Sequence, residues 1–164
     1  MYNNGLREGK WTTYYESILY QIRIDDKNKD VLNDLLNGKN SFFRKVNTVR
    51  NYKNGKMDGI SLGYDFLGTI RFSALYRENQ LNGTYIVYEN EKPKNIYSYK
   101  NDKLDGMWIS FFEGGTIELL CNYKEGKQFG DWDLFDEEGN IICSSKKGDL
   151  FPEFNAGKYY CKEK

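Results

Sequence analysis

The sequence of 164 residues contains no histidine, and this absence excludes several kinds of chemistry at once. Without imidazole there is no Ser-His-Asp or Cys-His catalysis and no metal site that uses histidine. The glycines do not form a phosphate-binding loop, and Cys121, Cys143 and Cys161 lack metal-ligand spacing. We therefore expect a protein that is not an enzyme and that has no cofactor and no metal site.

Net charge and long apolar runs are lacking as well. Lys and Arg number 24 and Asp and Glu number 24, so no overall field favours nucleic acid or an anionic membrane. No apolar run approaches the roughly 20 residues that span a bilayer. Met1 is followed by no secretory leader, and the cysteine count is odd. These features predict a cytoplasmic location, with Cys121 and Cys143 as a buried reduced pair, and neither nucleic-acid binding nor membrane association is expected.

Proline is scarce, with two residues against 16 glycines, and an internal repeat explains the glycines. Each copy begins with Tyr and closes with Gly seven residues later, and successive regular copies are 23 or 24 residues apart. A further copy, Tyr2–Gly9, opens the chain. The regular copies are Tyr52–Gly59, Tyr76–Gly83, Tyr99–Gly106 and Tyr123–Gly130.

Each copy is followed by the pattern of two strands. A short aromatic run follows the closing Gly106, a second turn falls at Gly114 and Gly115, and apolar residues then occupy alternate positions up to Tyr123. Asn-Gly and Gly-Gly pairs supply the positive φ angles of hairpin turns. The predicted fold is all-β, an elongated antiparallel meander of tandem β-hairpins in a single repeat domain.

Two sets of aromatic positions follow the closing glycines. Five residues after the glycine stand Tyr14, Tyr64, Tyr88, Phe111 and Phe135, and two residues after it stand Trp11, Ser61, Tyr85, Trp108 and Trp132. Because the offsets differ by an odd number, the two sets should face opposite sides of the sheet. Either the stacked rings hold successive hairpins together, or one set forms a ligand surface.

The chain divides into a first repeat (1–20), an irregular insert or degenerate repeat (21–49), four regular repeats (50–148) and a C-terminal cap (149–164). Apolar pairs at 31/32 and 35/36 predict a short amphipathic helix near residues 28–37. A degenerate hairpin is the alternative for that segment. The sequence leaves the oligomeric state open.

Charge is distributed unevenly along the chain, with a net +5 in residues 1–56 and −7 in residues 57–140. Carboxylates alternate with aromatic residues in the last regular repeat, an arrangement suited to anchoring a basic protein partner. The alternative is a solvated hairpin whose charges protect a sheet edge. The candidate partner-binding residues are Trp108, Trp132, Tyr85, Trp11, Asp131, Asp133, Asp136 and Glu137.

The pattern Tyr-x-Asn-Gly-Lys-x-x-Gly-x-Trp-x-x-Tyr/Phe resembles the MORN-repeat variant of bacterial antitoxins of the YwqK type, over residues 2–20 and 50–148. The sequence departs from it at 21–49, and at Ser61 and Tyr85, where Trp would be expected. The resemblance implies a twisted sheet of hairpins and a non-catalytic antitoxin or immunity protein that binds a toxin. The alternative is a MORN-type scaffold that binds lipid headgroups through Lys39, Arg44, Lys45, Arg50, Lys53 and Lys56.

Overall fold

The computed structural model describes residues 2–14, 46–145, 153–155 and 158–160, and every helix or strand within them is a β-strand. The strands are β1 (Tyr2–Asn3), β2 (Leu6–Arg7), β3 (Gly9–Tyr14), β4 (Val46–Lys53), β5 (Lys56–Met57), β6 (Gly59–Tyr64), β7 (Ile70–Arg77), β8 (Gln80–Glu89), β9 (Lys92–Lys100), β10 (Lys103–Phe111), β11 (Ile117–Lys124), β12 (Lys127–Phe135), β13 (Ile141–Ser145), β14 (Glu153–Asn155) and β15 (Lys158–Tyr160).

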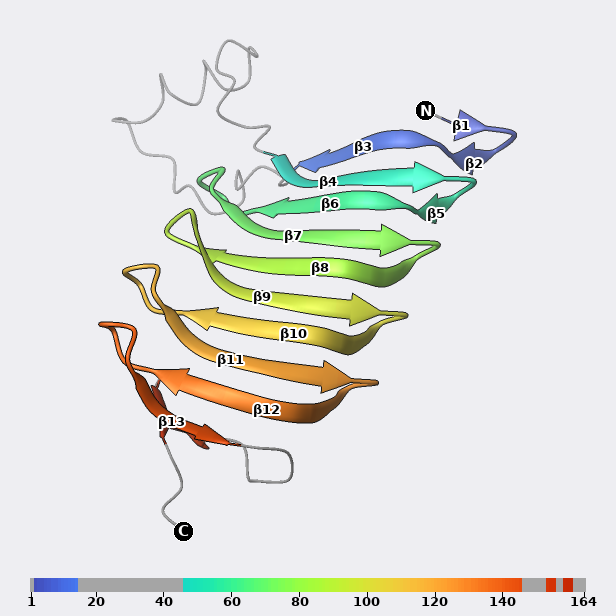
Figure 1. Cartoon of the computed structure of the whole chain (residues 1–164). Coiled ribbons are helices and arrows are strands. Elements are labelled where there is room, and N and C mark those ends of the chain that lie inside the picture. Colours follow the sequence, from blue (N-terminus) through green and yellow to red (C-terminus); the bar gives the residue numbers. More distant parts are fainter. Residues whose placement is uncertain (1, 15–45, 146–152, 156–157, 161–164) are drawn as a thin grey trace, which may run out of the picture.

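One antiparallel sheet of 11 strands runs from β3 to β13 in the order of the chain, except that β4 pairs with both β5 and β6 (Figure 1). The predicted all-β antiparallel meander of hairpins is therefore confirmed. The predicted helix near 28–37 lies outside the described residues. Residues 46–49, which the sequence analysis assigned to the insert, belong instead to β4, which pairs with β3 and β6. Within the predicted cap, β14 and β15 form a separate two-stranded hairpin.

The tight turns of the repeat template stack on one another along one edge of the sheet. Asn54 and Gly55 have φ angles of 49° and 77°, the left-handed conformation that a two-residue hairpin turn requires at both central positions. The Gly55 N–H donates a hydrogen bond of 2.9 Å to the carbonyl of Arg7, in the preceding turn. Later turns repeat this contact through Asn79 to Met57, Asp102 to Leu81 and Gly126 to Leu104. Backbone hydrogen bonds thus join the tight turns of successive repeats.

A β-bulge near the start of each second strand adds one residue to one face. Ser110 pairs with Leu119 and Phe111 with Ile117, so Glu118 is the extra residue. The Ser110 hydroxyl donates to Glu118 Oε2 at 2.9 Å, which places this carboxylate on the same face as Ser110. The corresponding extra residues are Asn47, Arg71, Lys94 and Ile142.

The core lies on one face of the sheet, toward its C-terminal end. Leu119 and Cys121 are 0% exposed, and Trp132 and Leu134 complete the buried cluster. All four come from β11 and β12, and Trp108 of β10 packs against them. The two faces of this sheet therefore differ in how much of their surface is open to solvent.

Candidate protein-binding faces

The first face, here called the aromatic face, is defined by one transverse row of paired residues. The row crosses the sheet from β6 to β13 and comprises Ser61, Ala74, Tyr85, Tyr97, Trp108, Cys121, Trp132 and Ser145. The sequence analysis did not predict Tyr97 as a site residue, because it lies on the second strand of its repeat, where the neighbouring repeats have Ala74 and Cys121. The matching 23-residue or 24-residue offset was the signal that could have found it.

Stacked rings on the aromatic face join successive hairpins. The ring centroids of Tyr97 and Trp108 are 5.6 Å apart and the rings lie at an interplanar angle of 23°. The centroid of Trp108 lies 5.9 Å from that of Tyr123 in the next repeat. The Trp108 indole N–H donates to Asn95 Oδ1 at 3.2 Å. Burial raises the pKa of the Tyr97 and Tyr123 hydroxyls. These contacts support the structural interpretation of this aromatic set.

The predicted tryptophan anchors do not form one exposed surface. Trp108 and Tyr85 lie in the aromatic row, but Trp132 is only 5% exposed and cannot receive a partner as it stands. Trp11 lies at the N-terminal end of the sheet, where its ring contacts Tyr2 at 5.0 Å between centroids. The guanidinium of Arg7 stacks 5.0 Å above the Trp11 ring, a cation–π contact.

The predicted carboxylates are not beside Trp132. Asp133 pairs with Leu120 whereas Trp132 pairs with Cys121, so period-two alternation puts Asp133 on the opposite face from Trp132. Asp131 is exposed and lies in the register shift between Gln128 and Trp132. The Asp136 carboxylate accepts hydrogen bonds from the Asn140 backbone and side chain at 2.7 and 3.0 Å, which lower its pKa. Asp136 is thus part of a turn, and Glu137 follows it on an exposed loop. The composite anchor predicted around Trp132 is therefore not formed.

The opposite face, here called the aliphatic face, has its own transverse row. This row was missed although branched residues recur three positions after the closing glycines, as at Leu62, Ile86 and Ile109. Its apolar members are Val49, Leu62, Ile86, Ile96, Ile109 and Leu120, interrupted by Ser73 and ended by Asp133 and Ser144.

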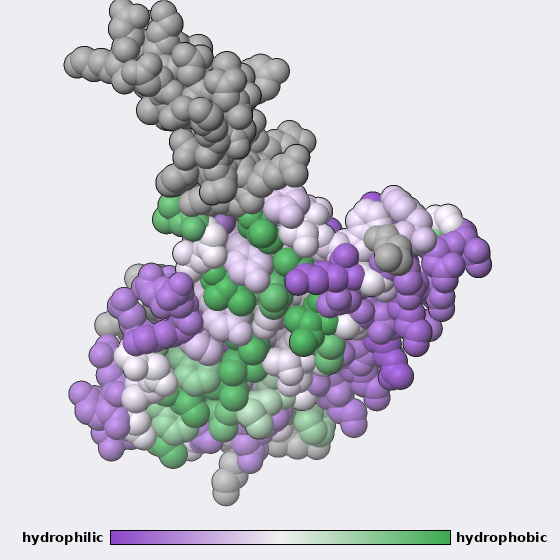
Figure 2. Space-filling view, turned by 90° about the horizontal axis from the view of Figure 1, so that it is seen from above, coloured by the Kyte–Doolittle hydropathy of each residue, from purple (hydrophilic) through white to green (hydrophobic). Residues whose placement is uncertain are grey.

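Much of the aliphatic face is open to solvent. Ile60 and its cross-strand partner Leu75 are 55% and 39% exposed, and Met107 is 45% exposed. The Tyr88 hydroxyl lies 3.5 Å from that of Ser73, which places Tyr88 on this face and confirms the predicted separation of the two aromatic sets at this repeat. A view from above shows apolar side chains gathered centrally between hydrophilic margins (Figure 2).

The two turn-bearing edges of the sheet differ in charge, because the tight-turn edge is mixed whereas the opposite edge is mostly acidic. The tight-turn edge carries basic residues together with carboxylates such as Asp102, whose Oδ1 accepts the Leu81 N–H at 2.7 Å. The opposite edge carries Arg71, Lys92 and Lys94 but mostly carboxylates. The basic set is Arg7, Lys53, Lys56, Arg77, Lys100, Lys103, Lys124 and Lys127, and the acidic set is Asp65, Glu89, Glu91, Glu113, Asp136, Glu137 and Glu138.

The cysteines differ from the expected reduced pair. Cys121 is a free, fully buried thiol, and burial raises its pKa to about 12. Cys143 is disulfide-bonded, so the prediction is wrong for this residue. Among the described residues there is no group of three or more side chains suited to a metal ion, and no helix there could cross a membrane.

Comparisons with known proteins add little. No family model matches the chain, and no curated protein does. Two solved structures are weakly similar, one of TarM and one of a mutant of S. aureus TarM in complex with fondaparinux, α-GlcNAc-glycerol and UDP. The TM-scores are 0.39 and 0.40 and the identities 14% and 12%. Each match covers 82% of this chain, which spans about a quarter of those chains.

Proposed function

We propose that the chain is a non-catalytic protein-binding module that binds its partner through the aliphatic face. The observation behind this proposal is the exposure of Ile60, Leu75 and Met107 beside the aliphatic row, which only Ser73 interrupts between Val49 and Leu120. Contiguous exposed apolar surface bordered by polar residues is characteristic of protein interfaces. The open shape of the sheet favours a broad partner surface over a small molecule, which would be held in a concave pocket.

The specific form of the proposal is a bacterial antitoxin or immunity protein that neutralises a toxin by covering its active surface. This form rests on the resemblance to MORN-type antitoxins and on that analogy alone. The carboxylates on one edge of the sheet favour a partner whose apolar contact surface is bordered by basic residues, because opposed charges speed encounter and fix orientation.

A lipid-binding scaffold is the second candidate, supported by the lysines and arginines of the tight-turn edge. Lys53 and Lys56 lie on that edge, whereas Arg50 lies within β4, opposite Trp11. Lys39, Arg44 and Lys45 lie outside the described residues. Binding of this kind depends on surface charge and weakens with salt.

The test is affinity capture from the native cell, followed by binding measurements with the purified partner. Ile60→Ser with Met107→Ser removes two exposed aliphatic side chains from the face. Leu6→Ser with Leu67→Ser is the matched control, because these residues are 49% and 75% exposed and lie outside it. We expect the first pair to weaken binding about tenfold or more, as loss of interface anchors does, and the control pair to change it less than about twofold.

Equal affinities of the two double variants would reject the aliphatic face as the binding surface. Flotation with anionic vesicles at low and high salt tests the second candidate. Association that is lost at high salt and abolished by Lys53→Gln with Lys56→Gln would favour the scaffold instead.

A further inference from the structure

A hollow of about 460 Å³ lies at the acidic edge of the last regular repeat, between two successive turns. Its walls combine four apolar and four acidic side chains. They are Phe112, Glu118, Leu134, Phe135, Asp136, Glu137, Glu138 and Ile142. The corresponding hollow one repeat earlier measures about 80 Å³ and is lined partly by Lys92 and Lys94. The larger hollow is therefore distinguished from its neighbour by its size and by its purely acidic charge.

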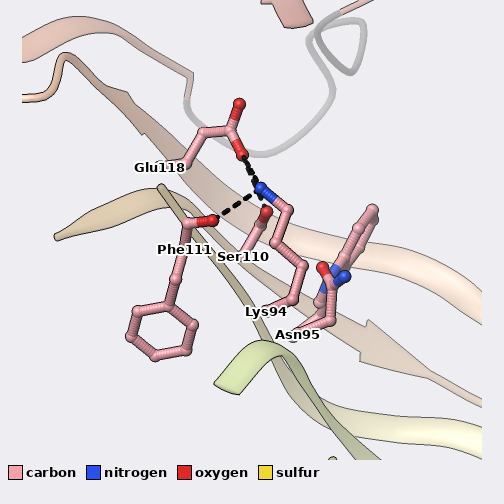
Figure 3. Close-up of polar contacts among 6 residues, drawn as sticks. Lys94, Asn95, Ser110, Phe111 and Glu118 are labelled. Atoms are coloured by element: carbon pink, nitrogen blue, oxygen red, sulfur yellow. Dashed lines mark hydrogen bonds and ion pairs between the residues drawn. The ribbon is translucent and has the colours of Figure 1, made fainter. Parts of the chain in front are cut away.

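Glu118 forms the inner wall of this hollow. Its side chain is only 8% exposed, and Oε2 accepts a hydrogen bond from Ser110 at 2.9 Å and lies 3.7 Å from Lys94 Nζ. Figure 3 shows the other carboxylate oxygen turned away from the lysine. Glu118 is one of the residues that line the hollow. A buried carboxylate with unused acceptor capacity favours a donor with positive charge.

The chain itself shows how a basic side chain fits this place in the repeat. Lys94, Glu118 and Ile142 are the equivalent bulge residues of three successive second strands. Lys94 extends along the sheet and donates a hydrogen bond of 2.7 Å to the carbonyl of Phe111, beside Glu118 (Figure 3). One repeat later the equivalent residue is Glu118 itself, so the lysine that fills the earlier position has no counterpart.

The rim of the hollow is held in place by hydrogen bonds. The Thr116 hydroxyl donates to the carbonyl of Glu137 at 3.1 Å, which joins the two turns that border the hollow. Asn140 bonds to both carboxylate oxygens of Asp136 and lowers the pKa of this group, so it stays ionised. Such fixed walls reduce the ordering cost of binding.

We propose that this hollow receives an arginine or lysine side chain of the protein partner. The apolar walls suit the methylene stem of such a side chain, and the carboxylates suit its charged end. The proposal rests on the proposed function. Because Glu118 and Leu134 lie on the aromatic side of the sheet, the basic side chain comes from a part of the partner that reaches over the acidic edge from the aliphatic face. Charge complementarity selects this occupant over an acidic or purely apolar side chain.

The test uses NMR titration of the full chain with the capped peptide acetyl-Gly-Arg-Gly-amide, followed through the methyl groups of Leu134 and Ile142. The citrulline peptide of the same length is the uncharged control. We expect saturable shifts at these methyls with the arginine peptide, and shifts at least about fivefold smaller with citrulline, because it lacks the charge. Equal shifts with both peptides, or none at millimolar concentrations, would overturn the proposal.

Three variants sharpen the test. Glu137→Gln with Glu138→Gln should weaken peptide binding roughly threefold to tenfold, as loss of two exposed charges permits, while Glu89→Gln with Glu91→Gln makes the same charge change on a neighbouring turn and should not. Because Ile142 is 58% exposed, we expect Ile142→Lys to leave the fold intact. This change should fill the hollow from within and abolish the Leu134 shift. Equal weakening by both glutamine pairs, or unchanged binding in Ile142→Lys, would contradict a specific site.

The larger proposal is separable from this one. If the peptide fails to bind while Ile60→Ser with Met107→Ser still disrupts the partner complex, the hollow is rejected and the aliphatic face is retained. If the peptide binds and those serine variants have no effect, the hollow is retained and the aliphatic face is rejected as the binding surface.

Discussion

Gly63 on β6 should not accept even a methyl group, and this gives a sharp test of the packing on the aromatic face. Gly63 is buried and pairs with Phe72 on β7, whose ring lies over it. A Cβ built on Gly63 would overlap Cε1 of Phe72 and lie 2.5 Å from Cδ1 and 2.6 Å from Cζ. The Phe72 ring is itself stacked on Tyr85, with centroids 5.8 Å apart at 12°.

Gly63→Ala must therefore displace Phe72 from Tyr85. Overpacking of this kind costs about 1–3 kcal/mol, and a lost ring pair accounts for about 0.5–1.5 kcal/mol within that range. Replacing glycine by alanine also lowers the conformational entropy of the unfolded chain, which offsets up to about 1 kcal/mol of this loss of stability. We expect a net decrease of about 1–2 kcal/mol in the free energy of unfolding.

Urea unfolding followed by tryptophan fluorescence measures this decrease. Gly114→Ala is the matched control, because its Cβ would meet no atom within 4 Å, and its free energy of unfolding should change by less than about 0.5 kcal/mol. Phe72→Leu in the Gly63→Ala background should recover part of the loss by removing the ring. Equal stability of Gly63→Ala and Gly114→Ala would refute the description of this face.

Three further predictions concern other parts of the sheet. Trp108→Ala removes ring contacts to two repeats and should lower the free energy of unfolding by about 3 kcal/mol, measured by urea titration; a loss below about 0.5 kcal/mol would contradict the stacking role. Because burial raises the Cys121 pKa to about 12, this thiol should resist an aromatic disulfide reagent at pH 8 in the native chain and react on unfolding, and rapid native reaction in a Cys121-dependent manner would contradict its burial. Asp136 has a lowered pKa when folded, so its stabilising contribution is present above the ordinary aspartate pKa of about 3.9 and is lost as pH falls through the lower folded value. Asp136→Asn should reduce this acid sensitivity in melting curves, and an unchanged pH profile would refute the assignment.

The hairpin architecture was predictable because local chemistry specifies it. Asn54 and Gly55 tolerate the left-handed backbone of a tight turn, and the recurring tyrosines lie near the ends of the strands that lead into such turns. The start of β4 was placed too late because Val46 and Thr48 lie upstream of the template tyrosine, where the motif has no marker.

The candidate site was predicted less well because it depends on pairing across strands. Side chains alternate between the two faces along a strand, so Asp133 and Trp132, which are adjacent in the sequence, lie on opposite faces and do not form one site. The position of Glu118 on the aromatic face arises from a bulge, which shifts the register by one residue and breaks the simple alternation. Trp132 is buried in a cluster with Leu119, Cys121 and Leu134, which forms across two strands and is not evident from spacing along one strand.

Hydroxyl-radical footprinting of Met107 tests the central claim most directly. The Met107 side chain on the aliphatic face is 45% exposed, whereas Met57 pairs with Tyr52 at the tight-turn edge and is the internal reference. We predict rapid oxidation of Met107 in the free chain and at least fivefold protection in the complex with the captured partner, as burial at an interface core would produce, with roughly unchanged Met57. Protection of Met107 in the free chain, or equal oxidation with and without the partner, would contradict an open face that binds protein.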